Sequence, residues 1–97
     1  MNQLAIPGTN TIERMREKLS SLEPSEIAIE DESAMHAGHE GAKSGGGHYR
    51  LRVISEHFAG LAPLARHRLV YDALADMMQR DIHALSIQAL TPDEAFA

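Results

Sequence analysis

Apolar residues recur along the first part of the chain every three to four positions, which is the spacing of one helix face. This pattern covers residues 12–22, and Asn10 with Glu13 three positions later is typical of an N-terminal capping box. Pro24 cannot continue a helix because it has no N–H group to donate. The spacing therefore predicts a helix from Asn10 to just before Pro24, after a flexible leader at residues 1–9.

Three other stretches have the character of strands. In residues 26–30 isoleucines alternate with other residues, and in residues 48–54 one side carries Tyr49, Leu51 and Val53 while the other carries the histidine and the arginines. The segment IHALSIQAL at residues 82–90 is short, apolar and bounded by charge. We expect two half-buried strands and a third strand near the C-terminus.

Two further helices complete the pattern. Pro63 suits the first position of a helix, and an apolar stripe continues from there to residue 78, which predicts about four turns. The stripe contains Leu64, Val70 or Tyr71, Leu74, and Met77 or Met78. Thr91-Pro92-Asp93-Glu94 contains the cap, proline and acid expected of a short C-terminal helix.

The predicted order is helix, strand, strand, helix, strand, short helix. This order indicates an α/β (α+β) fold with a small mixed three-stranded sheet and helices packed on one face, formed by a single domain at residues 10–97. A helix that crosses over between the second and third strands makes them parallel if they are neighbours.

Composition narrows the possible functions. The chain has 97 residues, no cysteine and a net charge of −5, which argues against a general polyanion binder. Any metal must be bound through imidazole, carboxylate or backbone oxygen. Without a signal-peptide pattern or a long apolar run, we expect a cytoplasmic protein with no membrane association.

The stretch HAGHEGAKSGGGHY at residues 36–49 raises three possibilities. Its glycines do not open a helix and are not followed by the residues of a P-loop, so a phosphate site is disfavoured. His36 and His39 have the H-x-x-H spacing, yet two imidazoles do not make a closed metal site. From composition alone, polar residues in a flexible loop are the favoured interpretation.

His83 makes a metal site more plausible only in combination with a second donor. It shares strand parity with Leu85 and Ile87, which predicts an imidazole on an otherwise apolar side. It becomes a ligand candidate if His36 or His39 approaches it in space. His48 and His57 have no evident partner in the sequence, and we interpret both as structural.

Arg66-His67-Arg68 lies in the predicted long helix, where successive side chains point about 100 degrees apart. Either one of them packs and two are solvated, or Arg66 and Arg68 contact an acidic partner or a phosphate. No Ser-His-Asp or Cys-His arrangement is present, so an enzyme is not expected.

The segment from His48 to Pro92, HYRLRVISEHFAGLAPLARHRLVYDALADMMQRDIHALSIQALTP, resembles the core of the BolA-like proteins. The family pattern runs from an H-[FY]-x-[LV]-x-[VL] strand, through an F-x-G-x-x-x-[LV]-x-R-H-R turn and helix, to an [IV]-H-A-L strand. The resemblance covers roughly residues 10–95, and RHR followed by HAL is its most specific part.

The resemblance implies a fold similar to the class II KH arrangement and a monothiol glutaredoxin as partner. The two proteins would share a bridging [2Fe-2S] cluster with glutathione. It also implies the ligands from this chain: His83 in the HAL strand, and a loop residue matched best by His36, with His39 as the alternative. Imidazole replaces thiolate in Rieske centres, so a chain without cysteine can act in this way.

The implied function is a non-enzymatic adaptor in iron-sulfur trafficking or in iron or redox sensing, a monomer alone or a weak homodimer. The alternative implied by the same family is a DNA-binding transcriptional regulator of stress response and cell morphology, with Arg66 and Arg68 as contacts. The net charge of −5, with Asp72 and Asp76 on the same helix, argues against DNA binding. An interaction module without metal is the third possibility.

Overall fold

The structure is a computed structural model that describes residues 7–33 and 47–97. The described residues form one three-stranded sheet with helical segments before, between and after its strands. In chain order the elements are α1 (Pro7–Leu19), the 3-10 turn η1 (Ser20–Leu22), β1 (Glu26–Asp31), β2 (Gly47–Ile54), the 3-10 turn η3 (Glu56–Phe58), α3 (Pro63–Ala73), β3 (Ile82–Leu90) and α4 (Pro92–Ala95).

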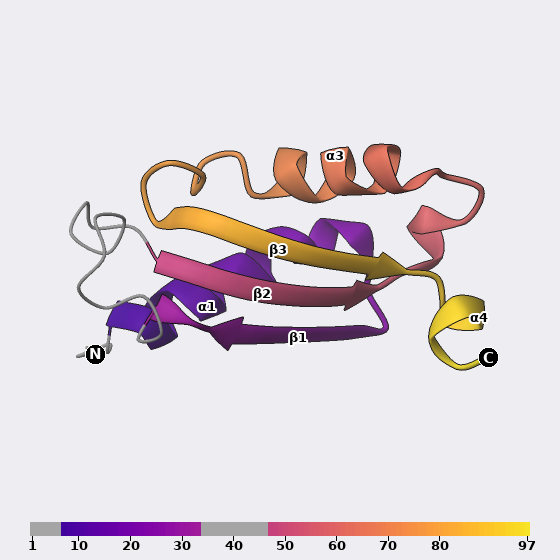
Figure 1. The fold of residues 1–97 in the computed structure, drawn as a ribbon, viewed down its shortest axis with the longest axis horizontal. Coiled ribbons are helices and arrows are strands. Elements are labelled where there is room, and N and C mark those ends of the chain that lie inside the picture. The colour runs from indigo at the N-terminus through magenta and orange to yellow at the C-terminus, as the bar shows by residue number, and fades with distance from the viewer. Residues whose placement is uncertain (1–6, 34–46) are drawn as a thin grey trace.

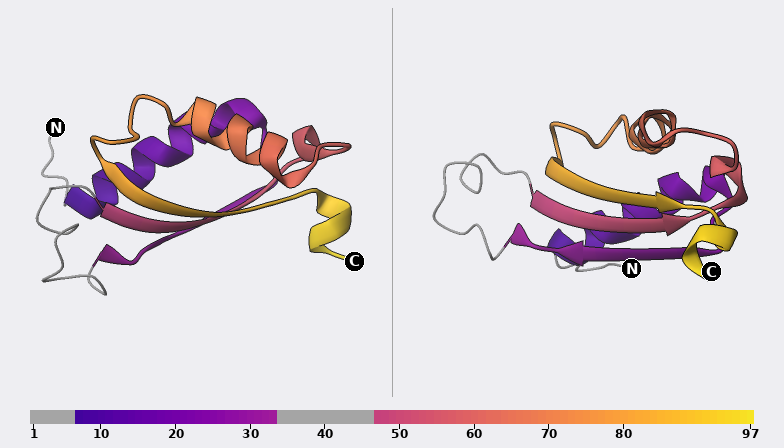
Figure 2. Two further views of the ribbon diagram at one scale, coloured as in Figure 1. Left: turned by 45° about the horizontal axis from the view of Figure 1, so that its top comes forward. Right: turned by 45° about the vertical axis from the view of Figure 1, so that its right-hand side comes forward.

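The sheet has the order β1-β2-β3, with β1 antiparallel to β2 and β2 parallel to β3. Because β2 and β3 are parallel neighbours, α3 serves as the crossover between them (Figure 1). Helices α1 and α3 cover one face of the sheet, and α4 lies at the end where β2 and β3 finish (Figure 2). The predicted fold class is confirmed, including the parallel pair.

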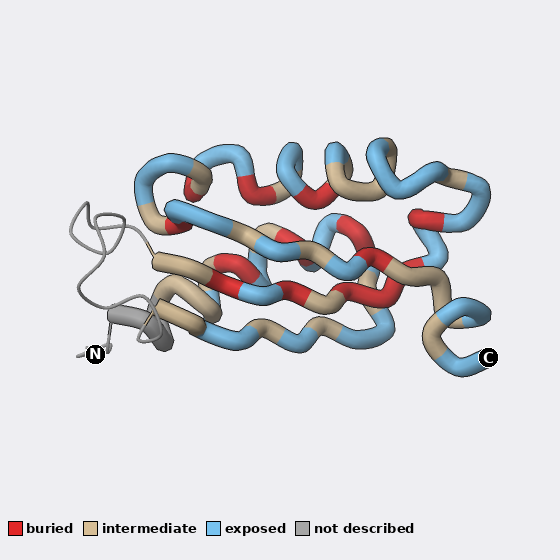
Figure 3. The backbone as a smooth tube through the Cα atoms, viewed as in Figure 1, coloured by how far each residue is buried: buried red, intermediate tan, exposed pale blue. Residues whose placement is uncertain are grey.

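The core lies between the sheet and the two long helices (Figure 3). The middle strand β2 supplies the residues predicted for its apolar side, all of them buried, while Arg50 on the opposite side is exposed. Burying an aliphatic or aromatic side chain of this size stabilises the fold by about 1.5 to 3 kcal/mol. The core is made of Met15, Leu19, Leu22, Tyr49, Leu51, Val53, Phe58, Val70, Leu74, Met77, Ile82 and Ala89.

The start of the first helix differs from the prediction. Helix α1 begins at Pro7, not at Asn10, so residues 7–9 of the expected leader are helical. Proline is well suited to the first helical position, because its fixed φ is already helical and its missing N–H would have no partner there. The capping box predicted for Asn10 and Glu13 is therefore wrong. Residues 1–6 lie outside the described part of the chain.

The long helix is also shorter than predicted. Helix α3 ends at Ala73, and the chain continues in turns to Gln79, which has a left-handed φ of 75°. Val70 and Met77 are fully buried, whereas Leu64 is 66% exposed and Tyr71 is 40% exposed, so neither of the last two belongs to the core. The apolar spacing beyond Ala73 comes from packed turns and not from a fourth helical turn.

The C-terminal helix agrees with the sequence pattern in detail. The Thr91 hydroxyl accepts a hydrogen bond from the Glu94 N–H, and the Glu94 carboxylate accepts one from the Thr91 N–H. Pro92 occupies the first turn. These reciprocal bonds satisfy two of the free N–H groups of a helix too short to be stable by itself.

Candidate metal and partner site

His83 lies where the regular pairing of β3 with β2 is interrupted. Gly47 pairs with Ile82, but the next residue, His48, pairs with Ala84, so His83 is an extra residue on the β3 side. Such a bulge redirects a side chain and is frequent beside functional sites. The prediction that His83 lies on the same side of the strand as Leu85 and Ile87 is consequently wrong. His83 is exposed and does not share the half-buried side of those two residues.

The bulge brings His83 against His48, with ring centroids 5.2 Å apart and ring planes at 43°. The backbone of His48 is fixed on both sides, because its N–H donates to the Ser33 hydroxyl over 3.0 Å and its carbonyl accepts from the Glu32 N–H over 2.7 Å. The Nε2 atom of His48 is buried, whereas His83 is exposed. His83 is therefore the imidazole of the pair that an external group can reach.

The sequence interpretation missed the place of His48 in this pair. A signal was available: neighbouring parallel strands begin at the same end of the sheet, and each of these strands has a histidine at its second position. His57, also interpreted as structural, lies 3.0 Å from a carboxylate oxygen of Glu23 through its Nε2 atom. That contact is formed near the other end of β2.

His36 and His39, the predicted loop ligands, lie outside the described residues. The described chain stops at Ser33 and resumes at Gly47, and the Ser33 hydroxyl is hydrogen-bonded to the residue that follows Gly47. The described residues that flank segment 34–46, Ser33 and Gly47, are thus beside the His48 and His83 pair. Chain connectivity is compatible with the predicted meeting of His83 with a loop histidine, which remains a prediction.

The donor set of the described residues is small. Within residues 7–33 and 47–97, no three histidine, aspartate or glutamate side chains are grouped so that they could hold a metal ion. One exposed imidazole fits a shared centre in which a partner supplies the remaining ligands, and it does not fit a closed site within these residues.

A shallow hollow of about 270 Å³ adjoins the histidine pair. Glu32 at its rim forms a 3.1 Å ion pair with Arg50. The hollow is lined by Glu32, His48, Tyr49, Ala84, Leu85 and Ser86. Tyr49, Ala84 and Leu85 give this hollow apolar lining beside His48.

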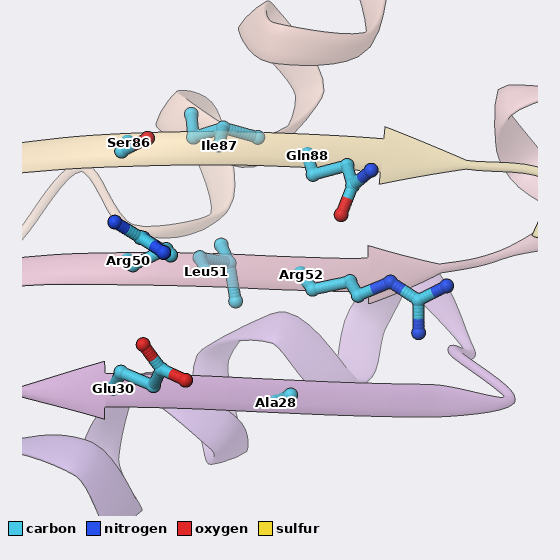
Figure 4. A pocket seen from close by; sticks show the side chains of 8 residues that line it. All are labelled: Ala28, Glu30, Arg50, Leu51, Arg52, Ser86, Ile87 and Gln88. Carbon is cyan, nitrogen blue, oxygen red and sulfur yellow. The ribbon is translucent and has the colours of Figure 1, made fainter.

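A second hollow, of about 200 Å³, lies on the sheet face that the long helices leave uncovered (Figure 4). Arg50 and Arg52 project into it from β2, with Ala28 of β1 and Ser86 of β3 on either side. Glu26 forms a 3.0 Å ion pair with Arg52, so both arginines of β2 already contact an acid of this chain. This neutralisation makes the face a weak attractant for anions.

Arg66, predicted as a contact residue, is engaged within the fold. Its guanidinium donates to the Leu61 carbonyl over 2.8 Å, to the Ala89 carbonyl over 3.0 Å and to both Glu94 carboxylate oxygens over 2.6 and 3.0 Å. Hydrogen bonding to Arg66 lowers the pKa of Glu94 to about 2, with further lowering from the Thr91 N–H. These bonds join the start of α3, the end of β3 and α4.

Arg68, the other predicted contact, is exposed on α3. It lies between Leu64 and Tyr71, which are exposed on the same helix. Of the two arginines, Arg68 is the one whose side chain is accessible to a partner.

Comparisons with known proteins agree with this structure. The sequence profile described as BolA-like protein matches residues 19–94. Protein BOLA1, chloroplastic, of Arabidopsis thaliana is 44% identical over 90 residues, which are 89% of this chain and 56% of that protein. The DNA-binding transcriptional regulator BolA of Vibrio cholerae is 43% identical over 81 residues, which are 82% of this chain and 74% of that protein.

The fold matches solved structures as well. The BolA domain of SufE1 from Arabidopsis thaliana superimposes with a TM-score of 0.74 at 43% identity, covering 95% of this chain and 99% of that one. The chain spans 24% of the length of the curated SufE-like protein 1 from the same plant, with 45% identity over 87 residues and 84% of this chain covered. With a family match across most of its length and relatives above 40% identity, the chain belongs to the BolA-like protein family.

Proposed function

We propose that the protein is an adaptor that binds a monothiol glutaredoxin and, with glutathione, shares a bridging [2Fe-2S] cluster. The observation that supports this proposal best is the bulge at His83, which puts an exposed imidazole at the end of the sheet. Imidazole is an established ligand for one iron of a [2Fe-2S] centre. A cysteine-free chain can therefore contribute ligands while its partner provides thiolates.

His83 is the first ligand in this proposal, and His36 is the second, with His39 as its alternative. His48 acts as a support, because its ring packs against His83 from a backbone that Ser33 and Glu32 hold in place. Neighbours of this kind orient a ligand and limit its rotamers. The cluster, when bound, would supply one-electron redox chemistry and would be exchangeable, because protons compete with the metal for imidazole more readily than for a thiolate that is already bound.

The proposed role is non-enzymatic and serves iron-sulfur trafficking or iron and redox sensing. No helix within the described residues is long and apolar enough to cross a membrane. A cytoplasmic location remains part of the proposal, and related plant proteins are named as chloroplastic or as chloroplastic and mitochondrial.

Anaerobic cluster reconstitution tests the proposal. The protein is mixed with a monothiol glutaredoxin and glutathione, and visible absorption and circular dichroism are recorded for the wild type and for His83→Ala, His36→Ala and His39→Ala. We expect a heterodimer spectrum that differs from that of the glutaredoxin homodimer. It should be lost with His83→Ala and with one of the two loop variants.

His57→Ala is the matched control, because His57 is an exposed histidine that contacts Glu23 near the other end of β2. It should leave the heterodimer spectrum unchanged. A wild-type spectrum in the His83 variant and in both loop variants would refute the metal role of these histidines. Complex formation without any cluster spectrum would instead support an interaction module.

The second candidate is a DNA-binding regulator, which the name of the Vibrio relative and the exposed Arg68 favour. Binding would depend steeply on salt, because each phosphate contact releases counterions. We would titrate labelled duplex DNA at 50 and 200 mM salt with the wild type and Arg68→Ala. A steep loss of affinity with salt and a weaker Arg68 variant would support this candidate, and the lack of a complex at 50 mM would exclude it.

A further inference from the structure

The two outer strands of the sheet have different edges. The β1 edge is rich in acids, with Glu26, Glu30 and Asp31 in a strand of six residues. Strand β3 has nine residues and none of its side chains is Asp, Glu, Lys or Arg. Charged side chains are a common means of preventing an edge strand from pairing with another chain, so the β3 edge lacks this protection.

The middle of the β3 edge presents backbone groups outward. The Ser55 N–H donates to the Leu90 carbonyl, so the even-numbered residues from Ala84 to Leu90 direct their backbone groups to β2. Leu85 and Ile87 then direct theirs to the open side. No hydrogen bond of the described residues outside the sheet reaches these backbone groups.

Both ends of this edge are covered by the chain itself. The Gln79 N–H donates to the Ile82 carbonyl over 3.1 Å, and Arg66 donates to the Ala89 carbonyl over 3.0 Å. The accessible part is therefore a short window centred on Ser86, which suits one extended segment of a few residues.

We propose that a second copy of this chain pairs with this window, β3 against β3, antiparallel and with the two-fold axis at Ser86. In this register Leu85 faces Ile87 of the second copy, and each pair exchanges both of its backbone hydrogen bonds. Ser86 faces Ser86 across the axis. The interface is isologous, the type found in most closed dimers.

The uncharged side chains of β3 favour a second copy as the occupant. Ala84, Ser86 and Gln88 on the helix-free side are uncharged, so the facing side chains of the two β3 strands bring no like charges together (Figure 4 shows Ser86 and Gln88). Leu85 and Ile87 are half-buried and pack on the core, and pairing would cover more of their apolar surface. The register uses no metal and is independent of the iron-sulfur proposal.

Because the chain has no cysteine, single-cysteine variants test the register directly. Facing residues of this type in antiparallel strands have Cα atoms about 4.5 Å apart, within the range of a disulfide. We expect Ser86→Cys to form an intermolecular disulfide under mild oxidation at least roughly tenfold faster than Ala28→Cys, because pairing raises the effective thiol concentration. Ala28 is the matched control, since it lines the same hollow from β1.

A second experiment, with a mixture of two cysteine variants, tests the register. A mixture of Ala84→Cys and Gln88→Cys should give the mixed disulfide dimer in preference to either homodimer, because residue 84 of one copy faces residue 88 of the other. Circular dichroism before oxidation shows whether each variant is folded. Equal rates for folded Ser86→Cys and Ala28→Cys would overturn the proposal, as would an unmodified protein that stays monomeric in sedimentation at millimolar concentration.

Discussion

A Cβ atom on residue 47 would lie 2.6 Å from Cε2 of Tyr49, closer than atoms can approach without displacement. The Tyr49 ring cannot move easily, because it is buried and hydrogen-bonded to the side chain of Thr11. Burial is also the main reason why the pKa of the Tyr49 phenol is raised. Gly47 is thus required at the start of β2 for close packing and not for loop flexibility.

Gly47→Ala should destabilise the protein by about 1 to 3 kcal/mol, which is typical of forcing an extra methyl group into packed surroundings. Urea unfolding followed by circular dichroism measures this change. In a Tyr49→Leu background the same substitution should cost much less, because the ring is gone. Equal costs in the two backgrounds would contradict the proposed clash.

Ser55 is the one buried polar residue of the described chain, and its hydroxyl has two hydrogen bonds. It donates to the Leu22 carbonyl over 2.6 Å and accepts from the His57 N–H over 3.0 Å. Ser55→Ala leaves the Leu22 carbonyl without this donor and should cost about 1 to 3 kcal/mol in the free energy of unfolding.

Ser25→Ala is the control for this change, because the exposed Ser25 hydroxyl makes only a 3.4 Å contact with the Ile54 carbonyl. It should alter stability by less than about 0.5 kcal/mol. Thermal or urea unfolding of both variants would provide the comparison. Similar stability losses would mean that the buried hydroxyl is not important for joining η1 to the end of β2.

Among the elements, α4 depends on a side chain from α3. The Arg66 guanidinium binds both carboxylate oxygens of Glu94, and the same arginine reaches the Ala89 carbonyl of β3. A helix of four residues has little stability without such support. The RHR part of the family pattern therefore has a structural role at its first arginine, while its second arginine is exposed.

This arrangement predicts a specific dependence of stability on pH. The folded pKa of Glu94 is about 2, below its ordinary value of 4.5, so the Glu94 carboxylate stabilises the fold above pH 4.5. This contribution decreases as the pH falls from 4.5 towards 2. Unfolding measured between pH 7 and 2 should show a smaller decrease in Glu94→Gln than in the wild type.

Asp93→Asn is the matched control, because Asp93 is an exposed acid of the same helix and lies outside the hydrogen bonds that join Arg66 to Glu94. Its acid response should follow the wild type. A Glu94→Gln variant that loses stability on acidification as steeply as the wild type would show that the Arg66 contact contributes nothing in solution.

For the whole molecule, net charge opposes self-association. Each copy has a net charge of −5, so two paired copies repel one another at long range. Salt reduces this repulsion, because the Debye length shortens from about 30 Å at 0.01 M to about 8 Å at 0.15 M. The backbone hydrogen bonds proposed for the β3 edge are short-range and are screened little.

We therefore expect the homodimer proposed at β3 to become stronger as salt increases. Sedimentation velocity at 0.01 and 0.3 M sodium chloride, over a series of protein concentrations, measures the dissociation constant in both conditions. A dimer weakened by salt would indicate that ion pairs hold it together, which would contradict pairing through the uncharged strand.

The sequence by itself determined which elements form and to which family the chain belongs. Strand β3 was predicted with its observed bounds, and the capping box of α4 was predicted with its residues, because both depend on neighbours a few positions away. The helix-start error at Asn10 was also local: Pro7 provided an earlier start that the pattern around Asn10 obscured.

Only the tertiary structure decided how distant residues meet. The extra residue in β3 that exposes His83, its contact with His48 and the engagement of Arg66 by Glu94 all depend on pairing between separate elements. Strand parity and helix spacing describe one element at a time, so neither could reveal a register shift between two strands. The physical reason is that register and side-chain contacts are set by packing across the whole sheet, where a single extra residue redirects a side chain.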